Sequence, residues 1–222
     1  MSNGDLRKVR TGLEKSQAAY FDELAREGIW EDFSDDEFPA VSVLMENWNI
    51  QPGEVVLEPG CGPGRLTQRL AEQVGSCGQV IACDISGEMV RRARQRSYPA
   101  SVRIDQCALT DLHPGDHTFD RIICFNVFPH FEAPLRILRH AYQLLRKQGV
   151  LWVCHSKGRD EINAIHADGG PQIQGHRLLP AQELAELMTK AGFEVCSQRD
   201  TSDIYWVEAK RAMEEESDEV EF

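Results

Sequence analysis

A short apolar run that breaks into three alternating glycines is the feature of this sequence that most constrains its fold. Residues 55–64 read Val-Val-Leu-Glu-Pro-Gly-Cys-Gly-Pro-Gly. Glycine has no Cβ and tolerates a positive φ angle, so a buried strand that ends in such a turn can bring bare backbone against a ligand. Asp84 closes the next apolar run, 20 residues after Gly64, where an acid commonly holds the ribose hydroxyls of a nucleotide. The pattern predicts a ligand that contains adenosine.

The spacing of the glycines distinguishes two such ligands. The dinucleotide fingerprint Gly-X-Gly-X-X-Gly would place its third glycine one residue later than Gly64. Glu58 ends the preceding strand, and a carboxylate there would repel a pyrophosphate but attract a cation or an amino group. S-adenosylmethionine carries a sulfonium and an α-amino group, so the sequence favours it over NAD.

Strand and helix patterns alternate from residue 54 onward, which is typical of a parallel sheet with helices on both faces. We expect five parallel strands, at residues 55–58, 79–84, 101–106, 119–125 and 150–154. Two further strands, 193–198 and 204–209, have a short connection and should be antiparallel. The predicted fold is α/β, with a central, mostly parallel seven-stranded sheet and a C-terminal antiparallel hairpin.

Helices are expected where apolar residues recur at spacings of three and four. These positions are Leu66, Leu70 and Val74; Met89, Val90 and Ala93; Leu135, Leu138, Tyr142 and Leu145; and Leu184, Leu187, Met188 and Ala191. The outer face of the second of these helices carries Arg91, Arg92, Arg94 and Arg96. We interpret these arginines as a solvated face, with a phosphate contact as the alternative.

We divide the chain into three parts. Residues 1–50 hold two helical segments and form an N-terminal cap, and residues 51–212 form the ligand-binding domain. That domain contains an insert, residues 155–179, where the alternation stops and a long loop is expected on the ligand side. Residues 213–222 are an acidic tail that we expect to be disordered.

Composition limits the partners and the location. The net charge is −12 and no basic stripe is present, which argues against a nucleic-acid substrate. No apolar run is long enough to cross a membrane, and the N-terminus does not resemble a signal peptide. We therefore expect a cytoplasmic protein without stable membrane insertion. The oligomeric state is not indicated by the sequence.

The stretch from Glu58 to Gly64, followed by Asp-Ile-Ser-Gly-Glu-Met at residues 84–89, resembles the class I S-adenosylmethionine-dependent methyltransferases. It is most similar to the methyltransferase type 11 group, which includes the ubiquinone and menaquinone biosynthesis enzymes. The resemblance covers residues 40–155 well. It implies a Rossmann-like sandwich and transfer of a methyl group to a small-molecule acceptor by direct in-line displacement.

The resemblance also implies roles for residues of the cofactor site. Glu58 and the turn residues Gly60, Cys61, Gly62 and Gly64 would lie by the methionyl end of S-adenosylmethionine. Asp84 would bind the ribose hydroxyls, and Ile85 and Met89 would pack against the adenine. Asn126, after the fourth strand, would face the transferred methyl group.

One departure from the family pattern concerns the adenine. Members commonly have an acid after the third strand that contacts the adenine amino group, whereas this chain has Cys107 and Ala108 there, and Asp111 is the nearest acid. We expect backbone groups around Cys107 and Ala108 to hold the adenine. The alternative is that the alignment slips at this point.

His130 and His155 are candidate catalytic residues. Each follows the carboxyl end of a predicted parallel strand, and ligands of open α/β sheets bind at that edge. Transfer from a sulfonium mainly requires alignment in a dry pocket, so a general base is optional. Of the two histidines, His130 is the better candidate for a base.

The insert adds a further alternative, because His155, His166 and His176 fall within it. Three imidazoles can bind zinc, but their spacing matches no standard metal motif, so we assign no metal and keep lining of the acceptor pocket as the other interpretation. Aromatic residues suggest an acceptor that is aromatic or lipophilic. They are Tyr20, Phe21, Trp30, Phe33, Phe128 and Phe131.

Two other functions stay open at this point. A non-catalytic protein that binds S-adenosylmethionine for regulation would have the same glycine turn. An NAD-dependent oxidoreductase is disfavoured by Glu58 and by the glycine spacing.

Overall fold

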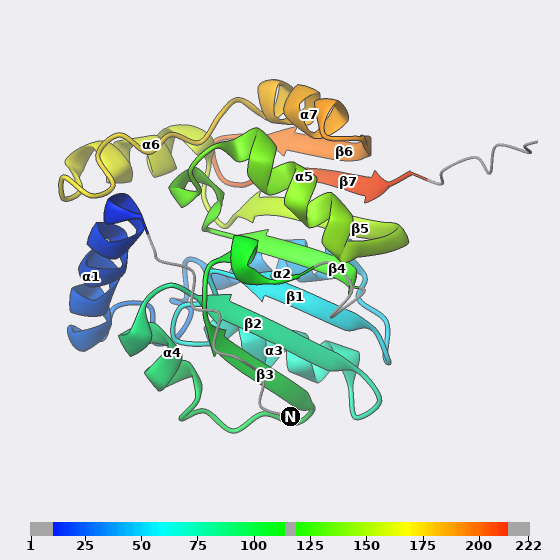
Figure 1. Ribbon diagram of the computed structural model, residues 1–222, viewed down its shortest axis with the longest axis horizontal. Coiled ribbons are helices and arrows are strands. Elements are labelled where there is room, and N and C mark those ends of the chain that lie inside the picture. The colour runs from blue at the N-terminus through cyan, green and yellow to red at the C-terminus, as the bar shows by residue number, and fades with distance from the viewer. Residues whose placement is uncertain (1–10, 114–118, 213–222) are drawn as a thin grey trace, which may run out of the picture.

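A seven-stranded sheet forms the centre of the computed structural model, which describes residues 11–113 and 119–212 (Figure 1). The strand order is β3-β2-β1-β4-β5-β7-β6. The strands are β1 (Val55–Pro59), β2 (Gln79–Asp84), β3 (Ser101–Gln106), β4 (Phe119–Phe125), β5 (Leu145–His155), β6 (Phe193–Asp200) and β7 (Tyr205–Arg211). The first five are parallel, and β7 is antiparallel to both β5 and β6. The predicted sheet is confirmed, and the predicted acidic tail lies outside the described residues.

The order of the strands determines where a ligand can bind. β1 pairs with β2 on one side and with β4 on the other, so the connections after β1 and β4 leave the sheet in opposite directions. In open α/β sheets the crevice at this switch point, beyond the carboxyl ends of the strands, is the ligand-binding position.

Helices cover both faces of the sheet and give two apolar cores. On one face lie α2 (Phe38–Trp48), α3 (Arg65–Val74) and α4 (Gly87–Ala93), and on the other lie α5 (Pro134–Leu144) and α7 (Ala181–Lys190). Neighbouring side chains of a strand point to opposite faces. Ile122 and Ile123 of β4 are both fully buried, one in each core, which explains the nearly continuous apolar sequence of this strand.

Two helices lie beside the edge at which the parallel strands end, α1 (Gly12–Arg26) and α6 (Arg159–Asp168) (Figure 1). A capping box starts α1: Thr11 Oγ1 accepts from the amide of Glu14, and the Glu14 carboxylate accepts from the amide of Thr11. Asp22 then attaches α1 to the start of α4, because its carboxylate accepts from Ser86 Oγ at 2.5 Å and from the Glu88 amide at 2.9 Å.

The expectation of a long loop at 155–179 is wrong for its first part, which contains α6. Ile162 and His166, four residues apart, are the buried positions of this helix, so one of the histidines considered as a loop ligand is a helical residue. Gly158 precedes the helix, and a Cβ there would lie 2.4 Å from the carbonyl oxygen of Ser202. This close approach fixes the position at which the chain turns into α6.

The boundary between α5 and β5 also differs from the prediction. Leu145 continues the helical spacing in the sequence, but it is the first residue of β5 and pairs with Phe119 of β4. The register shifts between Phe119 and Arg121. Burial of Leu145 against the neighbouring strand therefore overrides its helical periodicity.

The interpretation of the arginine cluster at the end of α4 as a solvated face is confirmed for Arg91 and Arg94, which are exposed, and is wrong for Arg92 and Arg96, which are partly buried. Arg92 forms an ion pair with Glu31, Arg96 donates to the Pro63 carbonyl oxygen at 2.7 Å, and Arg94 donates to the Ile104 carbonyl oxygen. These arginines connect α4 to the segment before α2, to the glycine turn and to β3. Glu31 and Asp32, about 60 residues earlier in the sequence, supply negative charges that pair with Arg92 and Arg96.

We predict that Ile122→Ala lowers the free energy of unfolding by about 2–5 kcal/mol, because it leaves a cavity in the core beneath α5. Val43→Ala, at an exposed position of α2, is the control and should change it by about 0.5 kcal/mol or less. Urea unfolding measures both. Equal effects would contradict the assignment of β4 to the centre of the core.

Candidate active site

A cavity of about 870 Å³ lies at the carboxyl ends of β1, β2, β4 and β5. Side chains of α1 and α6 also line it. All but Gly64 of the residues predicted for the site lie in its wall: Glu58, Gly60, Cys61, Gly62, Asp84, Ile85, Met89, Cys107, Ala108, Asn126, His130 and His155. The structure thus brings the predicted cofactor residues and the candidate catalytic residues into one space.

The glycine turn follows β1 with a positive φ angle at each of its three glycines. A Cβ at Gly60 would lie 2.3 Å from Val127 Cγ2, and one at Gly64 would lie 2.4 Å from the Tyr98 hydroxyl. At Gly62 no atom lies within 4 Å of that position. Gly60 and Gly64 therefore allow close packing, whereas Gly62 leaves bare backbone beside the cavity.

Asp84 fixes this turn to the next strand. Its carboxylate accepts from the Gly62 amide at 2.9 Å and from the Ser86 amide at 2.8 Å. The side chain is 9% exposed and lines the cavity. A carboxylate oxygen can accept more than one hydrogen bond, so the group can hold the turn and still bind hydroxyl donors.

Glu58 lies beneath the turn and is almost fully buried. The Thr67 hydroxyl donates to its carboxylate at 2.6 Å. Burial, with a smaller contribution from the negative charge of Asp84, raises the pKa of Glu58 to about 8. The carboxyl group is therefore mostly protonated at neutral pH, and a cationic ligand in the cavity would favour its ionisation.

The residues predicted to surround an adenine lie together at one end of the cavity. Ile85 and Met89 come from the loop after β2 and from α4, and Cys107 and Ala108 follow β3. The Ala108 amide donates to the Asp111 carboxylate at 3.0 Å. Asp111, the nearest acid in the sequence, thus orders the backbone of this short segment.

Asn126 follows β4 with a φ angle of 53°, a left-handed conformation that asparagine tolerates better than most residues. Its side-chain oxygen accepts from the Ser156 amide at 3.2 Å, and its amide nitrogen donates to Ser156 Oγ at 3.1 Å. Ser156 Oγ donates to Glu37 at 2.7 Å. Glu37 forms a bidentate ion pair with Arg65, in which the side chains are 13% and 10% exposed.

Four histidines gather at the other end of the cavity. The ring centroid of His130 lies 4.8 Å from that of His166 and 5.0 Å from that of His176. His155 is 1% exposed, lies edge-on to Tyr205, and has no hydrogen-bond partner for either ring nitrogen among the described residues. Within residues 11–113 and 119–212, no group of three or more His, Cys, Asp or Glu side chains is arranged to hold a metal ion.

Burial keeps these histidines neutral. It lowers the pKa of His155 to about 3 and that of His130 well below the ordinary value of 6.5. The pKa values of His166 and His176 are lowered as well, again mainly by burial. The histidine end of the cavity therefore carries little positive charge at neutral pH.

Sequence reasoning missed several residues that organise the site. Gln17 and Asp22 of α1 contact the histidine end and the start of α4, respectively. The helix periodicity of α1 shows no sign of these long-range roles. Glu37 and Arg65 were also missed, because an ion pair between residues 28 positions apart has no local signature.

We predict that Glu37→Ala lowers the free energy of unfolding by about 3 kcal/mol, because it leaves the Arg65 guanidinium buried without its partner. Glu72→Ala removes the acid of the exposed Arg69–Glu72 pair and serves as the control, with an expected loss below about 1 kcal/mol. Urea unfolding compares the two. A smaller loss for Glu37→Ala than for Glu72→Ala would argue against a structural role for the buried pair.

We also predict that the protein loses stability as the pH falls below 6.5. A histidine whose pKa is lower in the folded state binds fewer protons when folded, so its contribution to stability decreases with falling pH. This applies to His130, His155, His166 and His176. Glu58, whose pKa is raised, acts in the opposite direction, but it is one group against four.

Urea unfolding at neutral and mildly acidic pH checks this dependence. His155→Phe keeps a ring in the buried position and should reduce the loss, whereas His113→Gln, at an exposed position, should not. If the free energy of unfolding of wild type and of His155→Phe depended on pH in the same way, burial of the His155 ring would not contribute to the loss of stability at low pH.

Comparison with known proteins agrees with this geometry. A family model described as "Methyltransferase domain" matches residues 56–149. A ubiquinone biosynthesis O-methyltransferase from Xanthomonas campestris is 34% identical over 134 residues, which cover 58% of this chain and 53% of that protein. The chain thus spans about half the length of the curated relatives it matches.

Solved structures extend the similarity to most of the chain. A complex described as DhpI–SAH has a TM-score of 0.72 at 20% identity and covers 93% of this chain and 100% of its own. The 1,6-didemethyltoxoflavin-N1-methyltransferase of Burkholderia thailandensis, with bound 1,6-didemethyltoxoflavin and S-adenosylhomocysteine, has a TM-score of 0.64 at 20% identity, covering 96% and 99%. At this identity the likeness concerns the fold. Residues 56–149 match a methyltransferase domain, and the chain has the fold of the class I S-adenosylmethionine-dependent methyltransferases.

Proposed function

We propose that this protein is an S-adenosylmethionine-dependent methyltransferase that acts on a small-molecule acceptor. The observation that carries the proposal is the single cavity that joins the glycine turn, Glu58 and Asp84 to Asn126 and the histidines. A donor held at the turn and an acceptor held at the histidine end would share this space, and alignment of two reactants in a dry site is the main requirement of methyl transfer.

The residues at the glycine turn fit the proposed cofactor. Gly62 offers bare backbone, Asp84 offers a partly exposed carboxylate, and Glu58 offers a buried acid that a positive charge would ionise. S-adenosylmethionine supplies a methyl group on a sulfonium, which is an activated leaving group. A pyrophosphate beside this acid would keep it protonated and would gain no ion pair, so the same group favours a cationic ligand over a dinucleotide.

The acceptor end supports a small aromatic or lipophilic molecule. Apolar side chains next to His130 in the sequence or on the same helix as His166 line the cavity, namely Phe131, Ile162 and Ile165. The names of the relatives point the same way, since they include enzymes of ubiquinone biosynthesis and of toxoflavin methylation.

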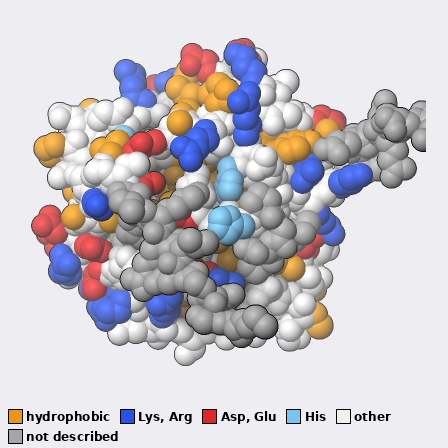
Figure 2. Space-filling model, in the orientation of Figure 1, with side chains coloured by type: hydrophobic (Ala, Val, Ile, Leu, Met, Phe, Trp, Pro, Cys, Tyr) orange, Lys and Arg blue, Asp and Glu red, His pale blue; other side chains and the backbone are white. Residues whose placement is uncertain are grey.

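The surface does not favour a nucleic-acid substrate. On the face drawn in Figure 2, Lys and Arg side chains of the described residues are interspersed with Asp and Glu side chains and form no broad basic area. Among the described helices, none is long and apolar enough to span a bilayer. A cytoplasmic location stays a prediction from the sequence.

We predict that the protein binds S-adenosylmethionine and not NAD in calorimetric titrations. Asp84→Asn should weaken S-adenosylmethionine binding about 10- to 100-fold, because the loss of charge removes charge-assisted hydrogen bonds. Asp105→Asn, in the neighbouring strand and outside the cavity wall, is the matched control and should bind normally.

A screen of small acceptors for release of S-adenosylhomocysteine then distinguishes an enzyme from a regulatory binding protein. Tight NAD binding without S-adenosylmethionine binding would overturn the proposed function. Binding of S-adenosylmethionine without turnover of any acceptor would favour the regulatory alternative.

A further inference from the structure

The ring nitrogens of His130 and His176 face each other, and a glutamine decides which of them carries the proton. Nδ1 of His130 lies 2.7 Å from Nδ1 of His176, so one donates and the other accepts. Nε2 of His176 lies 3.2 Å from the side-chain nitrogen of Gln17. That nitrogen also lies 3.4 Å from the His130 carbonyl oxygen, which can only accept. The Gln17 atom is therefore the amide NH2 group and donates to both.

These contacts set the tautomers of two rings. Because Gln17 donates to Nε2 of His176, the neutral ring of His176 carries its proton on Nδ1. That Nδ1–H donates to Nδ1 of His130, so the neutral ring of His130 carries its proton on Nε2. His130 thus has an N–H donor at its Nε2 edge.

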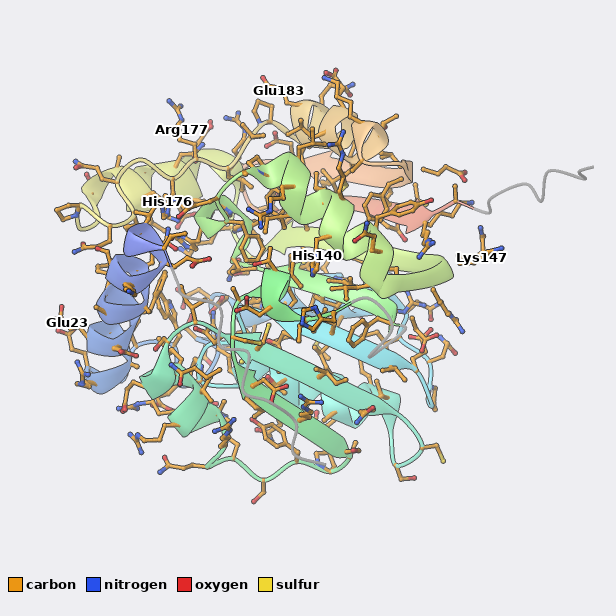
Figure 3. All side chains as sticks on the ribbon, viewed as in Figure 1. Glu23, His140, Lys147, His176, Arg177 and Glu183 are labelled. Atoms are coloured by element: carbon orange, nitrogen blue, oxygen red, sulfur yellow. The ribbon has the colours of Figure 1, made fainter. Side chains whose placement is uncertain are left out.

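His166 has the opposite tautomer. Its Nδ1 lies 3.1 Å from the carbonyl oxygen of His176, which can only accept, so Nδ1 is protonated and Nε2 has a lone pair. His130 and His166 both line the cavity, whereas His176 is not part of its wall and lies between α6 and the start of α1 (Figure 3). The Nδ1 atoms of His130 and His166 both form hydrogen bonds with His176. The Nε2 atoms of the two rings are therefore the ones available to a ligand in the cavity.

We infer that His166 is the base that takes the proton of the acceptor, while His130 donates a hydrogen bond to the same acceptor atom, so that the site selects a hydroxyl group. This inference rests on the proposed methyl transfer. A hydroxyl matches both rings, because its O–H donates to Nε2 of His166 and its lone pair accepts from Nε2–H of His130. A neutral amine nitrogen has one lone pair, which it needs to attack the methyl carbon, so it cannot also accept from His130, whereas a hydroxyl oxygen has two. A tertiary amine also has no proton to give, and a protonated amine has no lone pair.

The reaction balances with these two residues. The hydroxyl oxygen bonds to the sulfonium methyl carbon, and the carbon–sulfur bond breaks with its electron pair going to sulfur. The hydroxyl proton moves to Nε2 of His166, whose Nδ1–H stays bonded to the His176 carbonyl oxygen. The products are a methyl ether and S-adenosylhomocysteine, and His166 returns its proton to solvent.

His166 is better suited to this role than the other histidines. Its pKa is lowered by burial, and the hydrogen bond to the His176 carbonyl partly offsets this effect, so the ring is neutral at neutral pH but can still accept a proton. Nδ1 of His130 is already occupied, and the pKa of His155, at about 3, makes it a weak base. The sequence favours His130 as the base, whereas the tautomers make His130 the donor.

Other charged groups near His166 bear on its titration. His130, His155 and His176 are the histidines that face it. The charged side chains that line the same cavity are Glu14, Asp36, Glu37, Glu58, Arg65, Asp84, Asp111, Glu132, Arg136, Lys157, Glu161 and Asp203. The apolar side chains of Phe131, Ile162 and Ile165 in the cavity wall favour a phenol over a sugar hydroxyl.

Nitrogen NMR tests the tautomers without cofactor or acceptor. In protein with 15N-labelled histidine at neutral pH, long-range proton–nitrogen spectra distinguish a protonated ring nitrogen from one with a lone pair. Single His→Gln variants assign the signals. We expect His166 and His176 to be protonated at Nδ1 and His130 at Nε2. Protonation of His166 at Nε2 would overturn the inference.

Kinetics test the role of His166, with alkyl-substituted phenols, matched anilines and matched methyl ethers as probes. We expect turnover of phenols only. His166→Gln should lower kcat about 100-fold or more with little change in KM, because Gln keeps polarity but cannot take the proton. It should also abolish the fall of kcat on the acidic side of the wild-type pH profile. His113→Gln, exposed and outside the cavity, should behave as wild type.

Calorimetry with S-adenosylmethionine separates this inference from the proposed function. His166→Gln should bind S-adenosylmethionine as wild type does, which also shows that it folds. Wild type that binds no S-adenosylmethionine would overturn the proposed function. Wild type that binds S-adenosylmethionine but methylates no phenol, or a His166→Gln variant with wild-type kcat, would overturn the inference about His166 alone.

Discussion

The carboxylate of Asp84 is the contact on which the geometry of the cavity depends. It accepts from the amides of Gly62 and Ser86, so it fixes the loop after β1 to the loop after β2 where both line the cavity. Ser86 in turn donates to Asp22, which extends the same chain of hydrogen bonds to α1. One acid at the end of a strand therefore orders the glycine turn, its own loop and the helix beside them.

Ionisable groups around the cavity are of two kinds, those held in ion pairs and those that burial keeps neutral. Two ion pairs lie in its wall: Glu37 with Arg65, which also lies over the ring of Phe33, and Lys157 with Glu161. Titratable groups deeper in the wall, such as Glu58 and His155, are shifted by burial toward their neutral forms. The protein thus avoids unpaired buried charge before a ligand binds, and a cationic ligand meets an acid that can still ionise.

Local requirements explain what could be predicted from the sequence. The glycine turn and Asp84 were found because a strand-to-helix turn needs glycines at particular positions and the second acid follows at a nearly constant distance. The alternation of strand and helix patterns also predicted the sheet, because each pattern depends only on the spacing of apolar residues within its own segment. The meeting of His130 with His176 could not be predicted, because it depends on how α6 and the chain after it fold back over the switch point. Gln17, Asp22 and the Glu37–Arg65 pair are likewise products of tertiary packing.

α1 is held at two places that belong to different halves of the cavity. Asp22 bonds the loop beside the glycine turn, and Gln17, five residues earlier in the helix, bonds His176 and the backbone of His130. Because α1 is a rigid helix, a displacement at the Asp22 contacts also moves the Gln17 contacts, and the reverse. If a ligand in one half of the cavity changes how firmly α1 is held, it also changes the affinity of the other half for its own ligand. Thermodynamic reciprocity then requires the second ligand to change the affinity for the first by the same factor.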